Sequence, residues 1–141
     1  MVGVTAREYL RSIRQLDRAI AVKQRILDGL ERDKGRLSAV RYDADKVHSS
    51  THADPTMVVD KIDQLQREIN GMIDCYVDRK REALERIGRV YHRPYADLLT
   101  DVYINGLTLE QAAEQRNISN KTVCRWHGMA LQIFRRENNM T

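Results

Sequence analysis

The chain has 141 residues, a formal net charge of +4 and an isoelectric point of about 9.2. This length allows one domain, or a small domain with a long extension. Hydrophobic residues make up 42% of the chain and aromatic residues only 6%, and the remainder is rich in helix-favouring side chains, which predicts an all-α protein. The basic balance permits a polyanionic partner without requiring one.

Several classes of protein are disfavoured by what the sequence lacks. No window approaches the roughly 18 apolar residues of a membrane helix and no apolar leader is present, so we expect a cytoplasmic protein without membrane contact. Gly-rich phosphate loops, nucleophile elbows and metal-ligand spacings are missing, so we expect no enzyme, metal or cofactor. Cys75 and Cys124 lie far apart and are expected to be ordinary thiols.

A first long helix is predicted over about residues 5–40. Thr5 and Glu8 have the spacing of a capping box, in which each side chain bonds the other residue's backbone N–H. Apolar residues follow at intervals of three and four, which is typical of a narrow coiled-coil-like seam. The predicted seam residues are Ala6, Tyr9, Ile13, Leu16, Ile20, Leu27, Leu30 and Leu37.

Another face of this helix carries a basic stripe, because arginines recur there every seven residues. They are Arg11, Arg18, Arg25 and Arg32. Two interpretations stay open for this stripe. It is either a solvated outer face or a contact surface for nucleic acid or RNA polymerase.

A connecting loop is predicted over residues 41–55, because this segment is polar, contains a proline and has no helical period. Asp54 or Thr56 is expected to cap the helix that follows. His48 and His52 are four residues apart, but without a helical context or nearby carboxylates we expect ordinary loop histidines rather than metal ligands.

A second long helix is predicted over about residues 56–91. Its apolar face is wide enough for more than one packing neighbour. The face consists of Val58, Ile62, Leu65, Ile69, Met72, Tyr76 and Ala83, widened by Ile73, Val77, Leu84 and Ile87. We expect the two helices to form a long antiparallel hairpin domain over residues 1–92. A thin hairpin buries more surface if two chains pair, which predicts a homodimer that forms through this domain.

Residues 93–141 have a different pattern, which predicts a three-helix domain. Asn105-Gly106 is a helix-stop signal that supplies positive φ. Thr108 and Gln111 have the spacing of a second capping box. The three helices are predicted over about residues 95–104, 109–116 and 119–136.

The spacing around the second of these helices is typical of a helix-turn-helix. Ala112 and Ala113 supply small side chains where two helices cross closely. Asn117 follows at the turn, where left-handed backbone is needed and asparagine tolerates it well. Ile118 fills the angle between the helices, and Val123 faces back to the core. We therefore expect the third helix to be a recognition helix.

The front of this third helix is predicted to bind duplex DNA. Asparagine and arginine can make bidentate contacts with adenine and guanine, and a helix N-terminus attracts phosphate. Between Gln115 and Arg136 the chain has five Lys or Arg residues and no Asp or Glu. The candidate DNA-binding residues are Ser119, Asn120, Lys121, Thr122, Arg125, Trp126 and Arg116. Two alternatives stay open: a half-buried packing role for Trp126, and a structural or protein-binding role for the whole motif.

The stretches YINGLTLEQAA, NISNKTV and RWHGMAL resemble the C-terminal helix-turn-helix of phage regulators of the ArpU type, which is similar to region four of sigma-70 factors. HSSTHADPT and VDKIDQLQREI resemble the loop and second helix of a related phage and prophage family, so the resemblance covers nearly the whole chain. It implies a regulator of late phage or prophage transcription in a bacterial host, with promoter DNA and RNA polymerase as partners. Arg116 stands where sigma-like motifs usually carry leucine, which predicts looser packing of the second helix.

Two other functions stay open. A small-terminase-like packaging protein also combines a helix-turn-helix with helical oligomerisation segments, although it usually places the DNA-binding part first. A protein-binding adaptor would grip RNA polymerase through the hairpin. A ring of many subunits would favour the first alternative, and co-purification with polymerase after nuclease treatment would favour the second.

Overall fold

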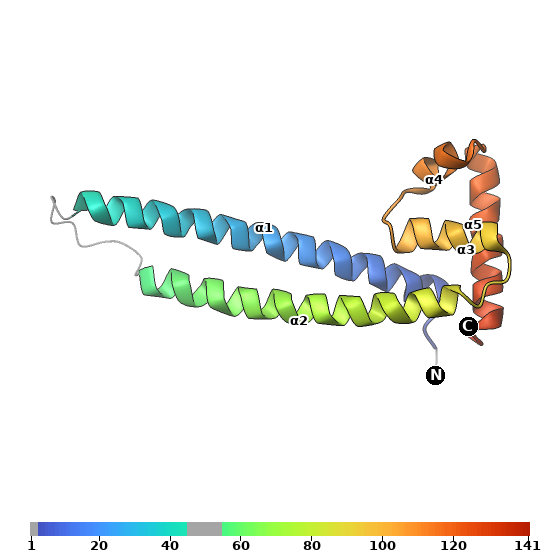
Figure 1. Cartoon of the computed structure of the whole chain (residues 1–141), viewed down its shortest axis with the longest axis horizontal. Coiled ribbons are helices and arrows are strands. Elements are labelled where there is room, and N and C mark those ends of the chain that lie inside the picture. The colour runs from blue at the N-terminus through green and yellow to red at the C-terminus, as the bar shows by residue number, and fades with distance from the viewer. Residues whose placement is uncertain (1–2, 45–54) are drawn as a thin grey trace. The chain divides into compact units, whose positions relative to one another are not determined.

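The structure is a computed structural model that describes residues 3–44 and 55–141, with side chains for residues 3–37 and 56–141. The described residues form an all-α fold in which two long helices pack as a hairpin and three shorter helices pack together after it, as predicted (Figure 1). The helices are α1 (Ala6–Ala44), α2 (Pro55–Ile87), α3 (Arg93–Tyr103), α4 (Leu109–Arg116) and α5 (Asn120–Glu137). None of these described helices is long and apolar enough to cross a membrane.

The two long helices begin close to their predicted starts. The Thr5 Oγ1 accepts a hydrogen bond from Glu8 N at 3.1 Å, and Glu8 Oε2 accepts one from Thr5 N at 3.0 Å, so the predicted capping box is confirmed. Helix α2 begins at Pro55, because the fixed φ of proline suits the first helical position, where no N–H is needed.

The two long helices end at different places from those predicted. Helix α1 continues past residue 40 to Ala44, because residues 41–44 contain no glycine or proline to stop its propagation. Helix α2 ends at Ile87 rather than near Tyr91, since Gly88 follows and favours leaving the helix. Of the loop predicted over residues 41–55, residues 45–54, which include His48, His52 and Asp54, lie outside the described residues.

The chain divides into two compact units. The first, here called the head unit, joins the chain up to Asp17 with Tyr76–Thr141, and therefore contains the start of α1, the end of α2 and all three short helices. The second, here called the hairpin unit, is Arg18–Cys75. The start of α1 and the end of α2 thus belong to the same unit as the helix-turn-helix.

The head unit has a continuous apolar core. Phe134 is fully buried at its centre, and the Tyr9 ring stacks on it with the ring centroids 6.1 Å apart. The other large side chains of this core come from α1, α2, α3 and α5 or from the turn after α2. They include Leu10, Ile87, Val90, Leu98, Leu99, Val102, Tyr103, Val123, Leu131 and Ile133. Leu10 was not among the predicted seam residues, because periodicity along α1 alone does not show that further helices pack on this end.

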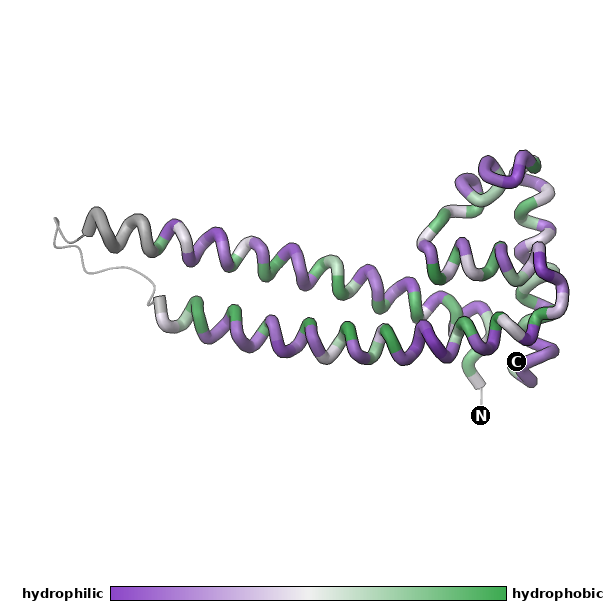
Figure 2. Tube along the Cα trace, in the orientation of Figure 1, coloured by the Kyte–Doolittle hydropathy of each residue, from purple (hydrophilic) through white to green (hydrophobic). Residues whose placement is uncertain are grey.

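The hairpin unit has only a narrow seam. Leu27 of α1 and Ile69 of α2 are its only fully buried side chains among those described. Predicted seam residues such as Leu16, Ile20 and Leu65 are half-buried, and apolar residues recur along both helices between hydrophilic stretches (Figure 2).

One ion pair accompanies this seam. Lys23 donates a hydrogen bond to Glu68 Oε1, so it links α1 to α2. Both side chains are partly exposed, and solvent therefore screens most of the gain from this pair. Lys23 can lie beside the apolar seam because its charged end reaches out to a partner at the edge.

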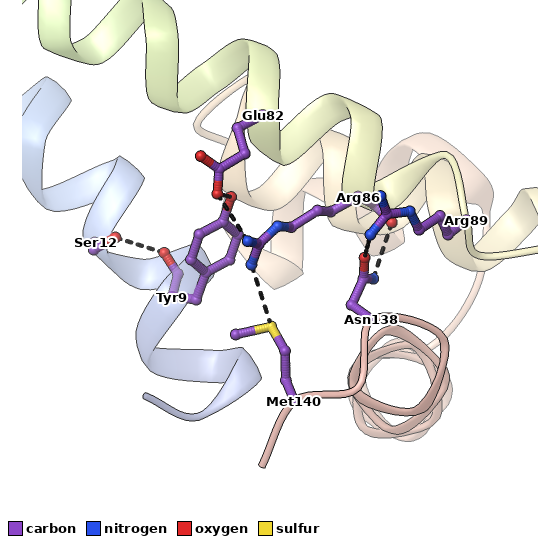
Figure 3. Close-up of polar contacts among 7 residues, drawn as sticks. All are labelled: Tyr9, Ser12, Glu82, Arg86, Arg89, Asn138 and Met140. Atoms are coloured by element: carbon purple, nitrogen blue, oxygen red, sulfur yellow. Dashed lines mark hydrogen bonds and ion pairs between the residues drawn. The ribbon is translucent and has the colours of Figure 1, made fainter. Parts of the chain in front are cut away.

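Within the head unit, the start of α1 is tied to the end of α2 by polar contacts (Figure 3). The Tyr9 hydroxyl donates to Glu82 Oε1 at 2.9 Å, and the Arg86 guanidinium lies 4.6 Å from the centroid of the Tyr9 ring. Arg86 also pairs with Glu82 at 3.1 Å. Burial and then the hydrogen bond to Glu82 raise the pKa of Tyr9 to about 12, so this phenol stays a donor.

The C-terminal residues are held against the same end of α2 (Figure 3). Asn138 accepts a hydrogen bond from Arg89 Nη1 at 2.8 Å and donates one to the Arg86 carbonyl at 3.1 Å. Arg86 Nη1 donates to Met140 Sδ at 3.7 Å. These contacts fix the end of α5 against α2 in the head unit.

Candidate nucleic-acid interface

The turn between α4 and α5 has the backbone geometry that the sequence predicts. Helix α4 begins with a capping box, in which Thr108 Oγ1 accepts from Gln111 N at 3.1 Å and Gln111 Oε1 accepts from Thr108 N at 3.0 Å. It ends at Arg116, and the next residue, Asn117, has a left-handed backbone with φ of 53° and ψ of 43°. Ser119 Oγ then accepts from Thr122 N at 3.1 Å and caps α5.

The packing behind this turn is close. Ala112 and Ala113 are buried, as is Val123 opposite them on α5, while Ile118 is half-buried against the same core. A larger side chain at either alanine would force the two helices apart, because interiors are packed without spare volume. The predicted core positions of the helix-turn-helix are therefore confirmed.

The end of α3 is also closed as predicted. Gly106 adopts a positive φ of 77°, which a side chain would strain. The Ile104 and Asn105 N–H groups both donate to the Thr100 carbonyl, and Leu107 N donates to the Asp101 carbonyl at 2.9 Å. The chain thereby reverses tightly before α4 begins.

Three polar side chains project from the front of α5 with their functional groups free. Asn120, Lys121 and Arg125 are exposed, and none of them has a hydrogen-bond or ion-pair partner in the described part of the chain. Ser119 and Thr122 instead bond each other, with their hydroxyl oxygens 2.9 Å apart, so their side chains serve the cap. The candidate residues thus separate into three free groups and two that hold the helix start.

Arg116 lies in a different setting from these side chains. Its Nη2 pairs with Asp101 Oδ2 at 2.6 Å, and Nη1 donates to the Ala112 carbonyl at 3.2 Å. The Arg116 side chain is only 18% exposed and that of Asp101 24%. The guanidinium therefore connects α4 to α3, in the position where an apolar side chain would connect them by packing.

Trp126 is half-buried on the side of α5 that faces the start of α3. Its ring meets the Tyr95 ring edge to face, with centroids 5.9 Å apart and planes at 78°. Both residues line an open cavity of about 480 Å³ together with Met129 and Arg136. Packing on Tyr95 gives Trp126 a structural role that does not depend on DNA.

Comparisons of the chain with known protein families, with curated proteins and with solved structures give no match.

Proposed function

We propose that this protein binds duplex DNA by inserting α5 into the major groove, and that it regulates transcription of phage or prophage genes. The observation that carries this proposal is the free, exposed set of Asn120, Lys121 and Arg125 on a helix that a capped, left-handed turn holds against a buried core. Recognition of base edges requires a few polar side chains that are held on a rigid helix.

Each of the three side chains has a chemistry that suits one part of the duplex. Arg125 can donate two hydrogen bonds to the O6 and N7 of guanine, and Asn120 can pair with the N6 and N7 of adenine. Lys121 lies in the first turn of α5, where the positive end of the helix dipole also attracts phosphate. Base contacts by Arg125 and Asn120 would give sequence preference, and Lys121 would add affinity.

Within the same proposal, the hairpin unit pairs two chains. Exposed apolar side chains support this, namely Val22 and Ile26 four residues apart on α1, and Met57 and Ile73 on α2. Two linked copies would bind two half-sites about 34 Å apart, which compensates for weak binding by a single motif. A clean monomer at micromolar concentration in analytical ultracentrifugation would contradict the dimer but leave DNA binding intact.

DNA binding is tested directly by selecting duplexes from a random pool and then measuring fluorescence anisotropy on the selected duplex. Arg125→Ala is expected to weaken binding to the selected duplex by about 1–3 kcal/mol and to relax the preference at one base position. Arg32→Ala is the matched control, because it removes the same charge from an exposed position in the hairpin unit. Equal affinity of wild type and Arg125→Ala would contradict the proposed readout.

Three further measurements address the biological role. Footprinting in a lysogenic host should place the protein at promoters of phage or prophage genes if it is a regulator. A ring of many subunits in native mass spectrometry would point instead to DNA packaging. Nuclease-resistant co-purification with RNA polymerase, without duplex binding, would point to an adaptor.

A further inference from the structure

Arginines from the start of α1 lie in the head unit beside the recognition helix. Arg7, Arg11 and Arg14, here called the arginine cluster, follow one another at four and three residues and so share one face of α1. They line an open cavity of about 390 Å³, whose other walls include Tyr103 of α3 and Cys124 and His127 of α5. Only Arg11 belongs to the heptad stripe that the sequence analysis singled out.

No acidic side chain neutralises this cluster. None of the three arginines forms an ion pair among the described residues, and no carboxylate lines the cavity. Further along α1, the arginines of the heptad stripe have acidic neighbours. Arg25 and Arg32 line a hollow there together with Asp28 and Glu31. Carboxylates thus line the hollow beside Arg25 and Arg32, whereas none lines the cavity beside the arginine cluster.

The remaining polar wall of the cavity is uncharged near neutral pH. The Tyr103 hydroxyl and His127 Nε2 share a hydrogen bond at 2.7 Å. Burial, and then the positive charge of Arg7, lowers the pKa of His127, while burial raises the pKa of Tyr103. The pair therefore offers a neutral surface, and the three guanidinium groups beside it have no ion-pair partner in the part of the chain that the structure describes.

The cluster flanks one edge of the proposed DNA-binding surface. Cys124, on the cavity wall, is exposed and stands one turn after Asn120 and directly before Arg125. A helix in the major groove has a phosphate strand on each side, because the groove is only about 12 Å wide. Side chains beside the edge of such a helix are therefore placed to meet phosphates rather than bases.

We propose that Arg7, Arg11 and Arg14 bind the phosphate backbone of the same duplex whose major groove holds α5, so that the first turns of the hairpin form part of the DNA-binding surface. This inference rests on the proposed function. Arginine suits the role because its guanidinium binds phosphate oxygens in a bidentate manner. Continuity with the exposed Lys121 and Arg125 favours nucleic acid over an acidic protein segment as the partner.

The test compares the salt dependence of duplex binding between two triple variants. Arg7→Gln/Arg11→Gln/Arg14→Gln removes the cluster. Arg18→Gln/Arg25→Gln/Arg32→Gln removes the same charge from the hairpin unit. Fluorescence anisotropy on a mixed-sequence duplex and on the selected duplex, from about 50 to 200 mM salt, gives the slope of log affinity against log salt. Circular dichroism first checks that each variant keeps its helicity.

The cluster variant should lose affinity equally for both duplexes, and its salt slope should be shallower by about three, since each lost phosphate contact removes about one. The hairpin variant should keep the wild-type slope. If the cluster variant does not fold, the single change Arg11→Gln, at an exposed position, should make the slope shallower by about one.

Two outcomes would overturn the inference alone while Arg125→Ala still weakens binding. One is an unchanged slope in the cluster variant, and the other is an equal loss in both triple variants, which would show only an effect of net charge. Absence of any duplex binding by the wild-type protein would overturn the proposed function as well.

Discussion

The head unit and the hairpin unit are built from the same two long helices but bury their side chains to different degrees. In the head unit, α1 and α2 meet three further helices, and side chains from all five helices belong to one apolar core in which Phe134 is fully buried. In the hairpin unit the described parts of α1 and α2 pack only on each other, and Leu27 and Ile69 are the fully buried residues among those described there.

This difference bears on what each unit can do. Side chains that contact DNA bases must be held on a rigid element. The continuous core of the head unit holds α5 in this way. The hairpin unit leaves apolar side chains such as Val22 and Ile26 exposed, so its own fold does not use all of its apolar surface. A second chain would bury this surface, which is why we propose pairing through the hairpin unit and DNA recognition by the head unit.

The largest expected effect comes from removing the centre of the head core. Phe134→Ala should lower the free energy of unfolding by about 3–5 kcal/mol, because it leaves a large cavity in a closed core. Leu27→Ala in the hairpin unit should cost about 2 kcal/mol, near the lower end for leucine, because partly exposed neighbours can collapse around the change. Urea unfolding followed by circular dichroism measures both, and equal losses would contradict the contrast between the units.

A smaller loss is expected from breaking the connection between α3 and α4. Asp101→Ala leaves the Arg116 guanidinium half-buried without its carboxylate and should cost about 1–3 kcal/mol. Adding Arg116→Leu should recover part of this loss, because an apolar side chain suits the same position. Thermal unfolding of the single and double variants measures the coupling, and purely additive effects would show that the ion pair contributes nothing.

The turn between α4 and α5 should show an effect of about 1 kcal/mol. Asn117→Ala places an ordinary side chain at a left-handed residue and should destabilise the head unit by about that amount, whereas Asn117→Gly should be nearly neutral. Chemical denaturation distinguishes the two variants. Equal stability of Asn117→Ala and wild type would mean that the left-handed conformation is not required.

The smallest effect is a dependence of head-unit stability on pH. An unperturbed histidine titrates near 6.5, and the pKa of His127 is lower because the ring is buried and near Arg7. The unfolded chain then binds more protons than the folded one as pH falls through this range, so stability should fall as pH falls.

This pH dependence is measured by urea unfolding between about pH 5 and 8. His127→Gln should make the profile flatter, because its amide can still bond Tyr103 but does not titrate. Identical pH profiles in wild type and variant would show that His127 does not contribute.

Local patterns predicted most of the helix-turn-helix. The two capping boxes, the left-handed Asn117 and the buried Ala112 depend on neighbours within a few residues, so spacing alone reveals them. The sequence predicts too late an end for α2, which stops at Ile87. The apolar pattern continues through Val90, which is buried in the head core without being helical.

Contacts between distant segments could not be predicted in the same way. The pairing of Arg116 with Asp101, and the approach of Arg7 and Arg14 to α5, depend on how the helices pack. The spacing of Arg7, Arg11 and Arg14 is visible in the sequence, yet nothing local distinguishes these three arginines from the others along α1. The exposure of Ile73, Val77 and Leu84 likewise appears only once the neighbours of α2 are known.

The most direct test of DNA recognition by the head unit is a titration of isotope-labelled protein with the selected duplex, followed by the amide chemical shifts in NMR spectra. We predict that the largest changes fall on Asn120–Arg125 and on the Arg7–Arg14 segment of α1. Amides of Arg18–Cys75 should change little if the dimer is already formed. Large changes confined to Arg18–Cys75, or no changes in α5, would contradict recognition by the head unit.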